Sequence, residues 1–204
     1  MIKAILFDFG GVLVRTEEYS ARHAWDARLG LPTGSVERAI QYSDLWIQAQ
    51  LGRVSYQTYW NGVAEMLRMR PAEIPPLREA YFSGDRLNYK LISLIRDLRE
   101  RGLKIALLSN NIPQLEERLR ELEIHTLFDH ILISAKLGVM KPDVTVFRVA
   151  LQTFKMAPQE VVYIDEALTN IRAAQPLGFH TILFRPEMDL RAELAHCLDQ
   201  PPTG

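Results

Sequence analysis

Short apolar runs recur along the chain and are separated by longer stretches with a helical period. The first run, "IKAILF" at residues 2–7, is almost continuously apolar and partly β-branched, and Gly10 and Gly11 follow it closely. Such a run is typical of a central strand that is buried on both faces of a sheet. Further runs that predict strands are "KIALLS" (104–109), "HILIS" (130–134), "VVYID" (161–165) and "TILF" (181–184).

Amphipathic segments fill the intervals between these later strands. Their apolar spacing predicts helices at residues 90–102, 114–123, 144–154, 169–178 and 189–198. Strands that alternate with helices form βαβ units, and such units build a parallel sheet with helices on both faces. The pattern therefore predicts an α/β fold with a doubly wound parallel sheet.

The region between residues 16 and 82 departs from this alternation, because it is polar and has a helical period throughout. Thr16 is followed by two glutamates, which predicts a helix start there. Pro32, Gly52 and Pro71 then divide the region into roughly four helices. Its aromatic residues are spaced so that they can line one apolar seam: Trp25, Tyr42, Trp46, Tyr56, Tyr59 and Trp60.

This helical region follows the first strand directly, so it is predicted to be an insertion into the α/β unit. We expect residues 1–15 and 83–204 to form the core domain and residues 16–82 to form a small helical domain. A chain of 204 residues is long enough for one sizeable core and a second, smaller module.

Composition and charge narrow the class of protein. Hydrophobic residues make up 48% and charged residues 24%, as in ordinary globular proteins. The net charge of -1 gives no electrostatic basis for binding nucleic acid or an acidic membrane surface. Cys197 is the single cysteine, which excludes an internal disulfide and fits a reducing compartment. With no apolar stretch typical of a signal peptide or a membrane span, we expect a cytoplasmic location.

Reactive side chains stand where the predicted strands end. Ligands of open parallel sheets bind outside the carboxyl ends of the strands, so these side chains are expected to meet at one rim. The strand-end residues are Asp8, Ser109, Asn110, Lys141 in the loop after the third strand, and the pair Asp165 and Glu166. This placement brings carboxylates, a hydroxyl and an ammonium group together.

That set of groups suits a cation and a phosphate. Carboxylates about 4 Å apart repel by roughly 1 kcal/mol in water and by about 4 kcal/mol at an effective dielectric constant of 20. Lys141 offsets part of the repulsion, and a hard divalent cation such as Mg²⁺, which prefers oxygen ligands, would offset the rest. Ser109 and the backbone N–H groups around Asn110 can then hold phosphate oxygens, while Asp8 is placed to act as a nucleophile.

In order and spacing, these motifs resemble those of the haloacid dehalogenase-like superfamily. The matching segments are the apolar strand that ends in Asp8, then "LLSNN", "KPD" and "VVYIDEALTNIRAAQPLGF". The resemblance covers essentially the whole chain, and residues 16–82 stand where that superfamily has a helical cap. Most members of the superfamily are Mg²⁺-dependent phosphatases, so the resemblance implies hydrolysis of a small phosphorylated metabolite.

The resemblance also implies roles for individual residues. Asp8 matches the nucleophile that forms an aspartyl-phosphate, Ser109 the hydroxyl that binds the transferring phosphoryl group, and Lys141 the cation that steadies both. Asp165 and Glu166 match the acidic motif that completes the metal site, together with the backbone carbonyl of Gly10. Asn170 is expected to support the acidic loop; whether Asp165 or Glu166 contacts the metal directly stays open.

Two positions depart from the phosphatase pattern. Gly10 stands where the family usually has a second aspartate that protonates the leaving oxygen, and such general acid–base help is worth roughly 10²–10⁴-fold. We therefore expect a preference for good leaving groups, such as sugar 1-phosphates or acyl phosphates. Glu166 stands where the family usually has aspartate, and its extra methylene moves the carboxylate outward by about one C–C bond.

Three alternatives remain beside the phosphatase. A metal-free dehalogenase of the same superfamily also lacks the second aspartate, but that branch typically has an aromatic residue where this chain has Gly10. A signalling receiver domain has its acceptor aspartate after a different strand. A catalytically impaired relative that serves as a binding protein is the third. Substrate specificity is expected to lie in the inserted region, where Arg53 is a better candidate for substrate contact than Arg15 or Trp46; the substrate and the oligomeric state are left open.

Overall fold

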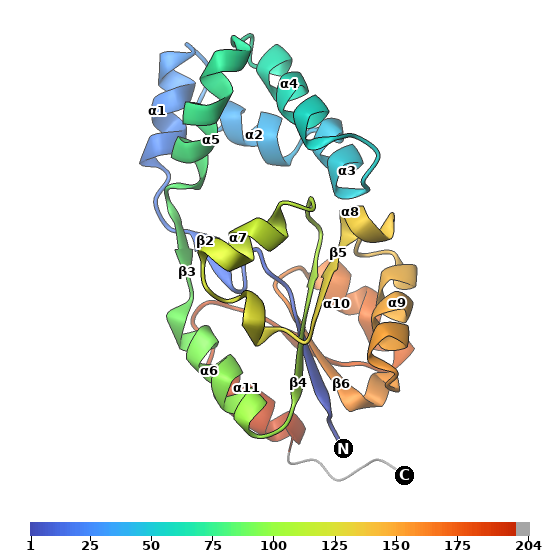
Figure 1. Ribbon diagram of the computed structural model, residues 1–204. Coiled ribbons are helices and arrows are strands. Elements are labelled where there is room, and N and C mark those ends of the chain that lie inside the picture. The colour runs from blue at the N-terminus through green and yellow to red at the C-terminus, as the bar shows by residue number, and fades with distance from the viewer. Residues whose placement is uncertain (199–204) are drawn as a thin grey trace.

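A five-stranded parallel sheet lies at the centre of the computed structural model, which describes residues 1–198 (Figure 1). The strands lie in the order β5-β4-β1-β6-β7, with the bounds β1 Ala4–Phe7, β4 Lys104–Ser109, β5 His130–Ile133, β6 Val161–Asp165 and β7 His180–Leu183. β1 pairs in parallel with both β4 and β6, so the first strand of the chain is the middle strand of the sheet. The predicted α/β fold with a doubly wound parallel sheet is confirmed.

Helices cover both faces of this sheet, and the side chains of β1 alternate between the two layers. Ile5 and Phe7 pack in an apolar cluster with α6, α7 and α11, whereas Ala4 and Leu6 pack in a second cluster with α9 and α10. Because both faces are buried, β1 needs apolar residues at every position, as its sequence has. The bounds of these helices are α6 Tyr89–Glu100, α7 Leu115–Glu121, α9 Val144–Phe154, α10 Leu168–Ala174 and α11 Leu190–Leu198.

Short helical turns complete the core and modify two predictions. The segment predicted as one helix over residues 169–178 ends at Ala174 and continues as a 3₁₀ turn, because Pro176 has no N–H group with which to extend an α-helix. A short helix, α8, follows β5 where the sequence suggested only a loop. The short elements are η1 Pro71–Glu73, η2 His125–Leu127, α8 Ser134–Leu137, η3 Pro158–Glu160 and η4 Gln175–Leu177.

The inserted region forms five α-helices between Ser20 and Phe82, one more than the sequence suggested. Ser43 explains the extra division, because its side-chain oxygen accepts a hydrogen bond from Trp46 N at 3.2 Å and so caps a new helix. The helices are α1 Ser20–Arg28, α2 Ser35–Gln41, α3 Asp44–Gln50, α4 Tyr56–Met66 and α5 Ile74–Phe82.

These five helices share an apolar cluster of their own. Trp25, Tyr59 and Trp60 are buried in it, and Trp46 packs against it, as the aromatic spacing predicted. Tyr42 is the exception, since it is 75% exposed and lies outside the cluster. In Figure 1 the five helices form a group above the carboxyl ends of β4 and β5.

A small antiparallel sheet that the sequence did not predict joins the insertion to the core. It consists of β2 Val14–Thr16 and β3 Asp85–Leu87. Thr16 therefore ends a strand, where a helix start was predicted, and its hydroxyl donates to Asp85 Oδ1 at 2.7 Å across the pair. Between Met1 and Leu198, no helix combines the length and the apolar character that a membrane span requires.

Candidate active site

Asp8 stands directly after β1, at the carboxyl edge of the central sheet. Its backbone N–H donates to the carbonyl of Ile164 in β6 at 2.9 Å, so the pairing of the two strands holds it beside the end of β6. The side chain is buried, with the residue 6% exposed. A carboxylate in this position needs a compensating charge.

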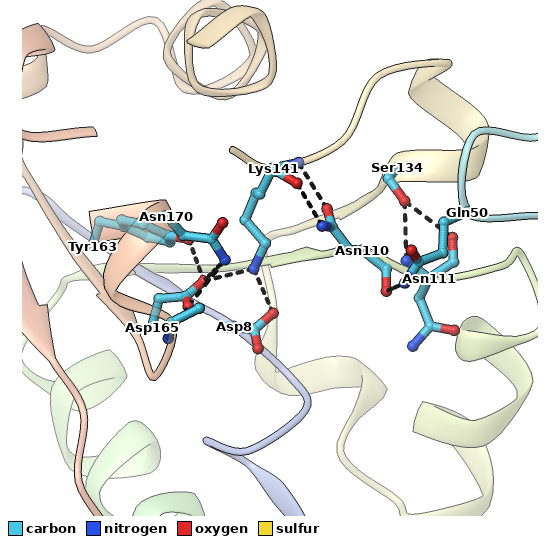
Figure 2. A network of polar contacts seen from close by, with 10 residues as sticks. Asp8, Gln50, Asn110, Asn111, Ser134, Lys141, Tyr163, Asp165 and Asn170 are labelled. Atoms are coloured by element: carbon cyan, nitrogen blue, oxygen red, sulfur yellow. Dashed lines mark hydrogen bonds and ion pairs between the residues drawn. The ribbon is translucent and has the colours of Figure 1, made fainter. Parts of the chain in front are cut away.

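Lys141 provides that charge. Its Nζ lies 2.6 Å from Asp8 Oδ1 and 2.7 Å from Asp165 Oδ2, and the lysine is itself buried (Figure 2). Burial alone would lower the pKa of Lys141, but the two carboxylates outweigh it and raise that pKa overall. The ammonium group therefore stays charged and bridges two loops that are far apart in the sequence.

Asp165, the last residue of β6, has both carboxylate oxygens engaged. Besides Lys141, Oδ2 accepts from the hydroxyl of Tyr163, and Oδ1 accepts from the backbone N–H of Ala167 at 2.7 Å. The side-chain amide of Asn170 donates to both oxygens at 3.1 Å. The group is fully buried and held from several sides, which fixes its orientation.

Asn110 fixes the backbone of Lys141. Its Oδ1 accepts from Lys141 N and its Nδ2 donates to Lys141 O, both at 2.8 Å. Both ends of this side-chain amide are therefore occupied by the protein itself. Ser109, the preceding residue, is buried at the end of β4.

Glu166 completes the same group of acids at its rim, where the residue as a whole is exposed but its carboxyl group is partly surrounded by protein atoms. Burial of its carboxyl group, with the nearby charges of Asp8 and Asp165, raises the pKa of Glu166 to about 8. The pKa of Asp8 is raised as well: burial is the largest cause, and Asp165 adds to it against the opposing effect of Lys141. One lysine thus does not fully compensate three carboxyl groups.

This excess of negative charge fits a divalent cation. Asp8, Asp165 and Glu166 each offer one carboxylate oxygen, and these oxygens lie within 4.8 Å of one another. Hard divalent cations prefer such all-oxygen sites. Burial and the neighbouring charges of Asp8 and Asp165 raise the pKa of Glu166, and a bound metal ion would oppose that effect.

The two glycines after the first strand differ in their surroundings. Gly11 has a φ of +77°, and a Cβ there would lie 2.8 Å from Cγ and Cδ of Glu166. A side chain at this position would collide with the acid at the rim. Gly10 has no atom within 4 Å of where its Cβ would stand.

The structure brings Asp8, Lys141, Asp165 and Glu166 together, whereas the three candidates for substrate contact, Arg53, Trp46 and Arg15, have contacts with residues outside this group. Arg53 is exposed and donates to Gln48 at 3.4 Å. Trp46 packs on Tyr59 with ring centroids 5.3 Å apart. Arg15 forms an exposed ion pair with Glu17 at 3.1 Å. The substrate-binding role of Arg53 stays a prediction.

Two residues of the network escaped the sequence interpretation. Tyr163 stands two positions before Asp165, and residues i and i+2 of a strand point to the same face, so strand alternation was a usable signal. Gln50, at the end of α3, donates from Nε2 to Asn110 O at 2.8 Å. Nothing in the sequence marks a glutamine of the insertion as a partner of a loop 60 residues away.

Comparison with protein families gives a match over most of the chain. A family model described as a haloacid dehalogenase-like hydrolase matches residues 2–178. Among curated proteins, the chain is 24% identical over 206 residues to the drimenol cyclase drtB of Aspergillus calidoustus, covering 98% of this chain and 37% of that protein. It is 27% identical over 178 residues to the sesquiterpene phosphatase astK of Aspergillus oryzae, covering 86% of each.

A solved structure matches the fold over nearly the full length of both chains. A HAD family enzyme from Bacteroides thetaiotaomicron, in complex with magnesium and inorganic phosphate, superposes with a TM-score of 0.77 at 21% identity, covering 95% of this chain and 99% of that one. The chain spans only 37%, 18% and 36% of the lengths of the first three curated relatives that it matches. Those relatives therefore share one region with it.

Proposed function

The chain belongs to the haloacid dehalogenase-like hydrolase family, and within that family we propose that it is a Mg²⁺-dependent phosphatase of a small phosphorylated metabolite. One observation carries the proposal: Lys141 is buried between Asp8 and Asp165, beside a third carboxyl group whose pKa is raised to about 8. A cation and a phosphate dianion together satisfy this arrangement, because the cation meets the carboxylates and the phosphate meets the lysine.

Asp8 and Glu166 are the proposed carboxylate ligands of the metal, with the backbone carbonyl of Gly10. Asp165 is less suited to direct contact, because Lys141, Tyr163, Asn170 and the Ala167 backbone already donate to its oxygens. We assign it the role of holding the lysine in place. When bound, Mg²⁺ would supply electrostatic stabilisation of the charge on the phosphoryl oxygens.

The proposed reaction proceeds in two steps through Asp8. A carboxylate oxygen of Asp8 forms a bond to phosphorus while the ester P–O bond breaks, and the leaving oxygen takes its proton from water because Gly10 carries no acid. Water then attacks the aspartyl-phosphate and releases inorganic phosphate and the free carboxylate. Lys141 and Ser109 hold the phosphoryl oxygens through both steps, and good leaving groups such as sugar 1-phosphates and acyl phosphates are favoured.

We further propose that residues 16–82 act as a cap domain over a core of residues 1–15 and 83–204. The separate apolar cluster of the inserted helices and the two-stranded connection of β2 and β3 support this division. A cap that covers the site excludes water during the first step and selects the leaving group.

A screen of phosphorylated metabolites tests the function. The purified chain is assayed with sugar 1-phosphates, acyl phosphates, primary alkyl phosphates and, because astK is named a sesquiterpene phosphatase, a sesquiterpenyl monophosphate. Phosphate release that requires Mg²⁺ and stops with a chelator is the expected result. Halide release from 2-haloacids in the presence of the chelator would instead identify the metal-free dehalogenase, and no turnover of any substrate would identify the impaired relative.

A further inference from the structure

The inserted helices contact the core at the loop that follows Ser109. Gln50 is buried, and its amide donates to Asn110 O at 2.8 Å. Two residues further along this loop, Ile112 packs against the apolar cluster of the inserted helices. A polar and an apolar contact thus join α3 and its neighbours to the segment 110–112, which we call the seat loop.

The same region is closely packed beyond the seat loop. Gly52, two residues after the end of α3, has a φ of +69°, and a Cβ there would overlap the carbonyl oxygen of Ala135 in α8. Ser134, at the start of α8, is fully buried and accepts from Asn111 N at 3.0 Å. The seat loop is therefore held both by Ser134 of α8 and by Gln50, and Figure 2 shows both side chains beside Asn111.

A continuous series of hydrogen bonds runs from Gln50 to the proposed nucleophile. Gln50 holds the carbonyl of Asn110, and the side chain of Asn110 holds Lys141 N and O at 2.8 Å each. Lys141 Nζ in turn lies 2.6 Å from Asp8 Oδ1. Any shift of Asn110 would therefore displace the backbone from which the bridging lysine extends.

We propose that Gln50 is a positioning residue. Through Asn110 it makes the position of Lys141 depend on the contact between the proposed cap, residues 16–82, and the seat loop. Gln50 touches neither Asp8 nor Lys141 in this network, so it acts only through the seat loop. The inference rests on the proposed phosphatase function. It differs from a substrate-contact role, because it requires Gln50 to matter even for a substrate whose leaving group is too small to reach the cap.

Gln50→Met is the variant that tests this role. Methionine keeps the length and packing of the side chain and removes the donor to Asn110 O, and loss of one such hydrogen bond lowers the ratio of correct to displaced geometry by roughly five- to tenfold. We expect kcat for acetyl phosphate to fall by a factor that approaches this value, with KM changed less than twofold. Gln57→Met is the matched control, since Gln57 in α4 makes a hydrogen bond of the same 2.8 Å length, but within its own helix, to Asn61.

Non-additivity supplies the second kinetic readout. The variant Asn110→Ala lacks the two side-chain hydrogen bonds to the backbone of Lys141. Adding Gln50→Met to it is expected to lower kcat for acetyl phosphate by less than a further twofold, because Gln50 acts on Lys141 only through Asn110. Unchanged acetyl phosphate turnover in Gln50→Met, or fully additive losses in the double variant, would overturn the proposal. Gln50→Glu, which is isosteric and also lacks the donor, replaces Gln50→Met if the latter does not fold.

Amide exchange of Lys141 separates this inference from the proposed function. Its N–H donates to Asn110 Oδ1, so exchange in the full chain is expected to accelerate in Gln50→Met and not in Gln57→Met. Faster exchange in a chain that hydrolyses no phosphate would support the coupling and reject the phosphatase. Mg²⁺-dependent hydrolysis by the wild type with unchanged exchange and unchanged kcat in Gln50→Met would reject the coupling and leave the phosphatase standing.

Discussion

The side-chain amide of Asn110 both donates to and accepts from the backbone of Lys141, and each of the two hydrogen bonds is 2.8 Å long. The lysine backbone is therefore fixed before any ligand binds, and Nζ already lies between the two buried carboxylates. A long, flexible side chain normally loses considerable rotamer freedom when it becomes ordered. Here the ordering of the lysine side chain is part of folding, so the ammonium group is already held between Asp8 and Asp165.

Asp8→Asn tests the nucleophile. Asparagine keeps the size of the side chain and an oxygen that can accept from Lys141, but its amide cannot form the aspartyl-phosphate. We expect the turnover number to fall by roughly 10³-fold or more, with a circular dichroism spectrum like that of the wild type. Turnover within tenfold of the wild type on any phosphate ester would contradict the role of Asp8.

Lys141→Met tests the charge balance of the site. The substitution leaves Asp8 and Asp165 buried without their shared cation, and removal of one partner of a buried ion pair costs about 3–5 kcal/mol. We expect a loss of that order in the free energy of unfolding, measured with urea at pH 8 in the presence of a chelator. The loss should shrink at pH 5, because a carboxyl group without its cation has a higher pKa and becomes protonated as the pH falls. A loss below about 1 kcal/mol at pH 8 would show that the lysine does not stabilise these carboxylates.

The sequence predicted the meeting of the strand-end residues because a parallel sheet brings the carboxyl ends of its strands to one edge. Asp8 and Asp165 stand at the ends of neighbouring strands, β1 and β6, which pair in parallel with Phe7 opposite Ile164. Lys141 belongs to a loop, but the segment that contains it leaves β5 at the carboxyl edge of the sheet. This connection keeps the loop near the same edge. Topology therefore carried this part of the prediction.

Sheet topology does not predict contacts between segments that are not paired in a sheet. Gln50 meets Asn110 only because α3 docks on the seat loop, and no pattern of apolar residues specifies that orientation. The β2–β3 pair escaped for a related reason: three-residue strands show too little alternation to be seen. The N-cap of α3 is different, because it depends on Ser43 alone. Serine is common at helix N-caps, so this residue could have predicted the division between α2 and α3.

The pKa of Glu166, raised to about 8 by burial and then by Asp8 and Asp165, predicts how metal binding depends on pH. The metal-free protein holds a proton on this group below pH 8, and a cation must displace that proton to use the carboxylate. The apparent affinity for Mg²⁺ is therefore expected to rise by up to about tenfold per pH unit between pH 6.5 and 8 and then to level off. Calorimetric titrations across this range measure it.

Glu166→Gln is the control for that dependence. Glutamine keeps the length of the side chain and has no proton to lose, so the affinity should be weaker at pH 8.5 and should vary less between pH 6.5 and 8. An affinity of the wild type that does not change over this range would mean that Glu166 is not a ligand.

Gly10→Asp tests whether the missing acid can be restored. No atom lies within 4 Å of the position that a Cβ at Gly10 would take, and its φ is not positive, so an aspartate fits there without backbone strain. Gly11→Asp is the matched control, because at a φ of +77° its Cβ would meet Glu166 at 2.8 Å, and we expect it to lower the melting temperature. For Gly10→Asp we expect a native-like melting temperature and a gain of roughly 10²-fold in kcat/KM for primary alkyl phosphates, with little gain for acyl phosphates, whose leaving groups need no proton. Equal gains for both substrate classes would mean that the new carboxylate acts on the metal or the fold; no gain for either would place the proton donor elsewhere in the site.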